Sequence, residues 1–188
     1  MSAQWVKTVS LAVAGGWLVS VLAGPGIGWP FTGDLTKDPA DVIEKYLSLD
    51  RRGARLKAAT AQVLRPYVAW DGEPSWGRLT VISRYEVIRD SRQWEVLNSQ
   101  EALIPVVFHV VGSLHIETAT FWPEVRVEER RFHIKAVDDR WRIVGPQLPP
   151  HVGLQRLIDY VRLLAWQETD ESRRVQLKRL QQALESVR

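Results

Sequence analysis

The stretch FHIKAVDDRWRIVGPQLPP, from Phe132 to Pro150, decides the fold. Apolar and polar residues alternate on both sides of Asp138-Asp139, which is the pattern of two strands joined by a tight turn. Three prolines follow, at positions 146, 149 and 150. Proline fixes φ and has no backbone N–H, so the second strand cannot run much beyond Val144. The sequence therefore predicts a β-hairpin that ends the sheet.

The length and composition describe an ordinary globular chain. It has 188 residues, of which 45% are hydrophobic and 25% are charged, which fits one well-cored domain with appendages. This composition argues against long disorder and against several membrane spans. The net charge is only +3 and both signs are interspersed, so no nucleic-acid partner is expected.

Two classes of site are disfavoured by the residues present. The chain has no cysteine, which excludes disulfides, thiol catalysis, cysteine-ligated zinc and a lipid anchor on an N-terminal cysteine. The histidines at 109, 115 and 133 form no HxH or HExxH motif, so no metal is expected. No cofactor is expected either.

Residues 1–23 are predicted to be a secretory signal peptide. Lys7 precedes the apolar run Val9 to Ala23, and small residues at its end provide a cleavage site before Gly24. An uncleaved signal anchor is the alternative, because extending the run back to Trp5 gives about 19 residues, about enough to span a bilayer. Either way we expect an exported protein in the periplasm or another extracytoplasmic space, anchored in the inner membrane if the segment stays uncleaved. Any membrane contact would then be through residues 1–23, if they stay uncleaved.

The remaining chain divides into three parts. Residues 24–37 are rich in Gly and Pro and are predicted to be a linker. Residues 38–150 are the predicted folded domain, and residues 151–188 the C-terminal amphipathic helices. Within the domain, Asp38 and Pro39 predict a helix start, and Gly53 its end.

A second helix is predicted over 54–68, interrupted or closed by Pro66. The segment 79–88, LTVISRYEVI, is β-branched and aromatic and predicts a long strand. After a polar turn, a short strand is predicted from Trp94 to Leu97. We expect these two strands to pair as the first hairpin of the sheet.

The longest apolar stretch, 101–118, predicts a central strand covered on both faces, with Pro105 at its start and a bulge at Gly112. Farther on, the apolar residues at 125 and 127 are at odd positions, whereas those from Phe132 onward are at even positions. Because side chains alternate between the faces of a strand, this slip predicts a bulge or break between Glu128 and Arg131.

The order of these elements, with Tyr46-Leu47 and Trp141-Arg142-Ile143 as small markers, resembles the NTF2-like (cystatin-like) superfamily over 38–150. The resemblance implies an α+β fold, with N-terminal helices packed in a strongly curved, bulged antiparallel sheet that forms a cone, followed here by C-terminal helices. Some members of the superfamily are enzymes, including ketosteroid isomerase and scytalone dehydratase. Many others are non-catalytic binding, transport-assembly or dimerisation modules.

The leading hypothesis is a non-enzymatic module that binds a small apolar ligand or a protein partner. The residues expected to line the mouth of the cone are Tyr46, Trp70, Phe108, His109 and Trp141. The alternative is an isomerase-like or dehydratase-like enzyme, which needs an oxyanion donor and a carboxylate or histidine base. Its candidate residues are Tyr46, Asp50, Glu86 and His109. The arginines that follow Asp50 also predict an ion pair at the helix end, and a filled, apolar cone would argue against the enzyme.

The C-terminal segment carries two apolar stripes at helical spacing. The first contains Leu154, Leu157, Ile158, Val161 and Leu164, and the second contains Leu177, Leu180, Leu184 and Val187. The second stripe is too short to form a stable helix alone in water. We therefore expect both to pack on their own domain or on a partner, and a homodimer is one option.

Overall fold

The computed structural model describes residues 38–187. The predicted targeting segment 1–23 and the linker 24–37 lie outside the described residues. Among the helices of residues 38–187, none is both long enough and apolar enough to cross a membrane.

The described part of the chain begins with a helix whose start follows from its sequence. Helix α1 spans Pro39–Arg51, and the Asp38 carboxylate caps it by accepting a hydrogen bond of 2.9 Å from the Ala40 N–H. Gly53 follows the helix with a φ of +83°, a left-handed conformation that glycine adopts at low cost. Both boundaries agree with the prediction.

The predicted second helix is instead three short pieces. They are the 3-10 helix η2 (Ala54–Leu56), helix α2 (Ala58–Ala61) and the 3-10 helix η3 (Gln62–Tyr67). Lys57 is extended and separates the first two pieces, and Pro66 lies inside the third, where its missing N–H cannot support an α-helical bond.

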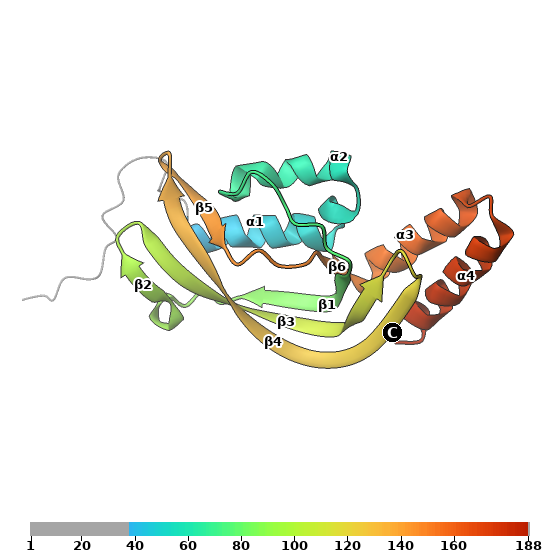
Figure 1. Cartoon of the computed structure of the whole chain (residues 1–188). Helices are drawn as coiled ribbons and strands as arrows, with labels where there is room; N and C mark the ends of the chain where they lie inside the picture. Colours follow the sequence, from blue (N-terminus) through green and yellow to red (C-terminus); the bar gives the residue numbers. More distant parts are fainter. Residues whose placement is uncertain (1–37, 188) are drawn as a thin grey trace, which may run out of the picture.

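In the part of the chain that the structure describes, six strands form one sheet. They are β1 (Leu79–Val87), β2 (Glu95–Asn98), β3 (Glu101–His115), β4 (Thr120–Val137), β5 (Arg140–Gly145) and β6 (His151–Gly153). Their order is β5-β4-β3-β1-β6, with β2 also paired to β3. Figure 1 shows that the long strands β3 and β4 curl strongly, with α1 and the short helices on the inner side of the curve. The α+β class with a curled sheet is as predicted.

The terminal hairpin is confirmed, but the sheet does not end with it. Strands β4 and β5 are joined at Asp138 and Asp139, both of which have positive φ. After the prolines the chain returns as β6, where Val152 lies beside Val81 of β1 in parallel pairing. A parallel neighbour contributed by three residues from a distant segment leaves no periodic signal, so the sequence did not reveal it.

The predicted pairing of the first two strands is wrong. Strand β1 pairs with the 106–114 part of β3, and β2 pairs with its first residues. The 3-10 helix η4 (Ser91–Gln93) separates β1 from β2, so they follow each other along one side of β3. The short turn between β2 and β3 makes this the first hairpin.

Strand β3 has the predicted bulge, but it differs from its prediction in the position of Pro105 and in how far its outer face is covered. The register with both neighbours shifts between Val110 and Gly112, which confirms the bulge. Pro105, however, lies inside the strand, where its carbonyl accepts a 3.0 Å hydrogen bond from Ile88 just after β1 ends. The even positions of β3 are buried and the odd ones mostly half-buried, so its outer face is only partly covered.

The break predicted between Glu128 and Arg131 is absent. The register between β3 and β4 is continuous there, and the irregularity lies instead between Pro123 and Arg126. Val125 and Val127 are exposed on the outer face of the sheet, so no change of face is required to bury Phe132. The assumption that both valines point to the core caused the error.

Two groups of buried residues form the core. The first lies between α1 and the inner face of β3, β4 and β5, and includes Tyr46, Phe108, Phe132, Trp141 and Ile143. The second joins the far end of the sheet to helices α3 (Leu154–Gln167) and α4 (Glu171–Glu185). It includes Leu157, Ile158, Leu177, Leu180 and Leu184. The C-terminal helices therefore pack on their own sheet, as one of the two expectations had it.

Candidate functional site

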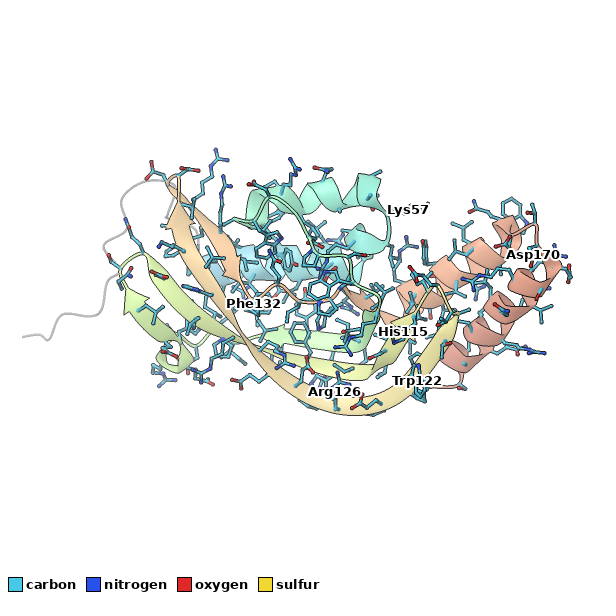
Figure 2. The ribbon with its side chains drawn as sticks, viewed as in Figure 1. Lys57, His115, Trp122, Arg126, Phe132 and Asp170 are labelled. Atoms are coloured by element: carbon cyan, nitrogen blue, oxygen red, sulfur yellow. The ribbon has the colours of Figure 1, made fainter. Side chains whose placement is uncertain are left out.

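Aromatic rings fill the space between α1 and the curled sheet. Tyr46 of α1 packs against Trp70 and Phe132, with ring centroids 6.4 Å apart in both pairs. Phe108 continues the row, 6.3 Å from Phe132 and 4.4 Å from the imidazole of His151. Figure 2 shows Phe132 between the sheet and α1. The interior is packed with side chains along this line.

A buried polar cluster lies at one end of the aromatic row. Arg55 donates two hydrogen bonds to the Asp50 carboxylate, one of 2.8 Å from Nε and one of 2.6 Å from Nη2. The backbone N–H of His151 donates a third to Asp50, at 2.9 Å. Arg55 also donates to the carbonyls of Leu148 and Pro149, and it lies over the ring of Tyr46.

The protonation states of this cluster follow from burial and pairing. Burial opposes the charge on Arg55, but Asp50 outweighs this effect and raises the pKa of the guanidinium above its usual range. Burial raises the pKa of the Tyr46 hydroxyl and lowers the pKa of His151. The imidazole donates Nδ1–H to the Pro149 carbonyl at 2.7 Å, so Nε2 carries the lone pair. Three N–H groups bind the Asp50 carboxylate, and they link the end of α1 to Arg55 and to the backbone of His151. The cluster therefore has a structural role.

The structure separates the residues of the enzymatic alternative. Tyr46 and Asp50 lie on the inner side of the sheet, where both contact Arg55. Glu86 is exposed on the outer face of β1, beside Val107 of β3. His109 lies on the same outer face, half-buried and next to Arg84. The sheet therefore stands between the two pairs of candidates.

The predicted ligand-binding residues are also divided. Tyr46, Phe108 and Trp141 are buried in the interior, and Trp70 is partly buried at its edge. Trp141 additionally lines a pocket of about 330 Å³ near Tyr67. His109 takes no part in either group.

A larger pocket of about 570 Å³ lies beside the filled interior. It is bounded by the short helices, by the turn segment that follows Trp70 and by the end of the sheet. Its apolar lining residues include Leu64, Val68, Trp70, Trp76, Leu79 and Ile116. Arg55 and Glu73, joined by a hydrogen bond of 3.2 Å, contribute polar atoms. We call this the Trp70–Trp76 pocket.

Trp76 is the functional candidate that the sequence analysis missed. Its Nε1 is buried and has no hydrogen-bond partner among the described residues. An indole N–H is a donor that is costly to bury unpaired. Two tryptophans six positions apart, on either side of a Gly and Pro turn, were the available signal.

The described residues contain no group of three or more His, Asp or Glu side chains placed to hold a metal ion. Comparison of the chain with protein-family models, with curated proteins and with solved structures gave no match.

Proposed function

We propose that this chain is a non-catalytic module of the NTF2-like type that binds a small apolar ligand in the Trp70–Trp76 pocket. The resemblance in element order, the curled sheet and the helix on its inner side support the NTF2-like assignment. The observation that carries the binding function is a pocket of about 570 Å³ with a mixed, mainly apolar lining that includes two tryptophans, one of which has an indole N–H without a partner among the described residues.

The lining defines the chemistry of the ligand. Two indole rings with aliphatic neighbours favour a ligand with a flat aromatic or aliphatic surface. Contact between such apolar surfaces is favourable because it removes both from water, and it needs no charge. The buried Nε1 of Trp76 favours one acceptor atom on that ligand. Arg55 and Glu73 already engage each other, so they add little preference for a charged ligand.

The non-catalytic form of the hypothesis fits this geometry better than the enzymatic one. A general base needs a free lone pair beside the substrate, whereas the buried Asp50 carboxylate already accepts three hydrogen bonds from Arg55 and His151. Glu86 and His109 lie across the sheet from Tyr46. The alternative ligand is a protein partner. The signal-like sequence of residues 1–23 supports export of the module or its tethering to the membrane.

Titration with 1-anilinonaphthalene-8-sulfonate, a small aromatic fluorophore, tests the pocket. We expect saturable binding to the folded chain, and a loss of affinity of about tenfold in Trp76→Ala, because a central aromatic contact is removed. Trp166→Ala is the matched control, since that side chain is 81% exposed on α3. Equal affinity in both variants, with both folded by circular dichroism, would refute binding at this pocket.

A further inference from the structure

One long edge of the sheet has no strand beside it among the described residues. Strand β5 pairs only with the 133–137 part of β4, whereas β3 pairs with β4 on the other side along nearly its whole length. Within residues 38–187, no strand pairs with the outer edge of β4 from Thr120 to Phe132. Figure 1 shows this curved part of β4 as the outermost strand. Such an edge presents backbone groups that can pair with another strand.

The direction of these backbone groups can be assigned from the register. Ala136 donates its N–H to Gln100 on the β3 side. In an antiparallel pair the groups alternate in direction along the strand, and the register is regular from Arg126 to Lys135. The N–H and C=O of Val127 therefore point to the open edge.

The outer face next to this edge is apolar. Trp122, Val125 and Val127 have exposed fractions of 63%, 82% and 65%. The irregularity between Pro123 and Arg126 places Trp122 on the same face as the two valines. Figure 2 shows Trp122 on the bend of β4 near the C-terminal helices. An exposed apolar group along an open edge is a common mark of an interaction surface.

The charges of the same segment alternate in sign. Glu124, Arg126, Glu128 and Arg130 form a ladder along the strand, with ion pairs of 2.8, 3.2 and 3.2 Å between successive members. If the segment is laid antiparallel against its own copy with Val127 opposite Val127, then Arg126 comes opposite Glu128. By the same count of residues Glu124, in the irregularity between Pro123 and Arg126, comes opposite Arg130. Centring the pairing on Arg126 or Glu128 would instead bring like charges together, which destabilises a sheet.

We propose that a second copy of this chain pairs with the first along β4, antiparallel, with a two-fold axis at Val127. With the axis at Val127, pairing can run from Trp122 to Phe132, because β5 occupies this edge of β4 from His133 onward. The two sheets then join into one, with isologous contacts as expected for a two-fold dimer. Because the charges at 124, 126, 128 and 130 are complementary to those of the same segment laid antiparallel, the partner at this edge is a second copy of the chain.

The absence of cysteine makes a direct test possible. In this register the two Val127 residues face each other as a hydrogen-bonded pair, at a Cα separation of about 5.5 Å, which a disulfide can bridge. The full chain carrying Val127→Cys should form a covalent dimer under mild oxidation at least about tenfold faster than the chain carrying Val125→Cys. The two residues at 125 are offset along the strands by about 14 Å and cannot be bridged. Equal rates, or no dimer in either variant, would overturn the proposal.

Charge reversal provides a second test on the chain without cysteine. Arg126→Glu places like charges opposite Glu128 of the second copy, so the dimer should dissociate in sedimentation equilibrium. Reversal of all four ladder charges, at 124, 126, 128 and 130, restores both the ladder and the pairing, so this variant should remain a dimer. Circular dichroism checks that each variant is folded. A monomeric wild type, or a dimer unaffected by Arg126→Glu, would refute the interface.

Discussion

Arg55 and Asp50 form an ion pair of 2.6 Å in which only 4% and 1% of the two side chains is exposed. Asp50 also accepts the backbone N–H of His151, the first residue of β6. One carboxylate thus joins the end of α1 to a strand that lies 101 residues later in the chain. This contact fixes the position of the helix on the curled sheet.

Arg55→Met should lower the free energy of unfolding by about 3 to 5 kcal/mol, because it leaves the Asp50 charge buried without its partner. Urea unfolding followed by circular dichroism measures the loss. The double variant Asp50→Leu with Arg55→Met should recover part of it, since no charge remains buried. Arg92→Met, which breaks the exposed pair with Asp90, is the control and should leave the midpoint unchanged. If Arg55→Met shifted the urea midpoint as little as Arg92→Met does, the ion pair of Arg55 with Asp50 would have no structural role.

His151 should make the fold less stable in mild acid. Burial lowers the pKa of this imidazole below its ordinary value of about 6.5, although Asp50 offsets part of the effect. As the pH falls below about 6.5 the unfolded chain takes up the proton first, so the free energy of unfolding decreases until the folded pKa is reached.

His151→Phe tests this assignment, because it keeps a ring against Phe108 and the backbone N–H to Asp50. The variant should lose less stability than the wild type between about pH 7.5 and about pH 5, in urea titrations at both values. Identical losses in the two proteins would show that His151 is not the group responsible.

Gly112→Ala should destabilise the sheet by about 1 to 3 kcal/mol. A Cβ at this position would lie 2.4 Å from the Trp122 carbonyl oxygen and 2.5 Å from the Phe121 ring, and backbone cannot move away cheaply. Gly72→Ala is the matched control, because no atom lies within 4 Å of its added Cβ. Thermal melts of both variants give the comparison, and equal melting temperatures would show that the β4 backbone yields at the bulge.

Leu184→Ala should cost about 2 to 5 kcal/mol, since its side chain is fully buried between α4 and the rest of the second core. Val175→Ala on the same helix removes a partly exposed side chain and should cost much less. Chemical unfolding monitors both. If the two costs were equal, α4 would not be a fixed part of this core.

The processing of the N-terminus remains a prediction, since residues 1–23 lie outside the described structure. The triplet Val21-Leu22-Ala23 predicts cleavage before Gly24. N-terminal sequencing of protein recovered from the cell envelope should find Gly24 as the first residue. Met1 or Ser2 at the start, in the membrane fraction, would establish the anchor instead.

Local patterns in the sequence were sufficient for the local structure. The start of α1 at Asp38 and Pro39, the turn at Asp138-Asp139 and the bulge at Gly112 all depend on the conformational limits of a few adjacent residues. The amphipathic helices at the C-terminus followed from spacing alone. The candidate site could be predicted only in part from the sequence, which indicated Trp70 but not Trp76.

Tertiary structure decided which segments meet. The pairing of β2 with β3, the parallel strand β6 and the contact of Arg55 with Leu148 join residues whose neighbours in sequence carry no sign of the partner. The outward direction of Val125 and Val127 was likewise settled by the register of β4 against β3. The chemistry of a residue limits the conformations of its own backbone. Its tertiary contacts depend on how distant segments pack together, and neighbouring residues in the sequence carry no sign of that packing.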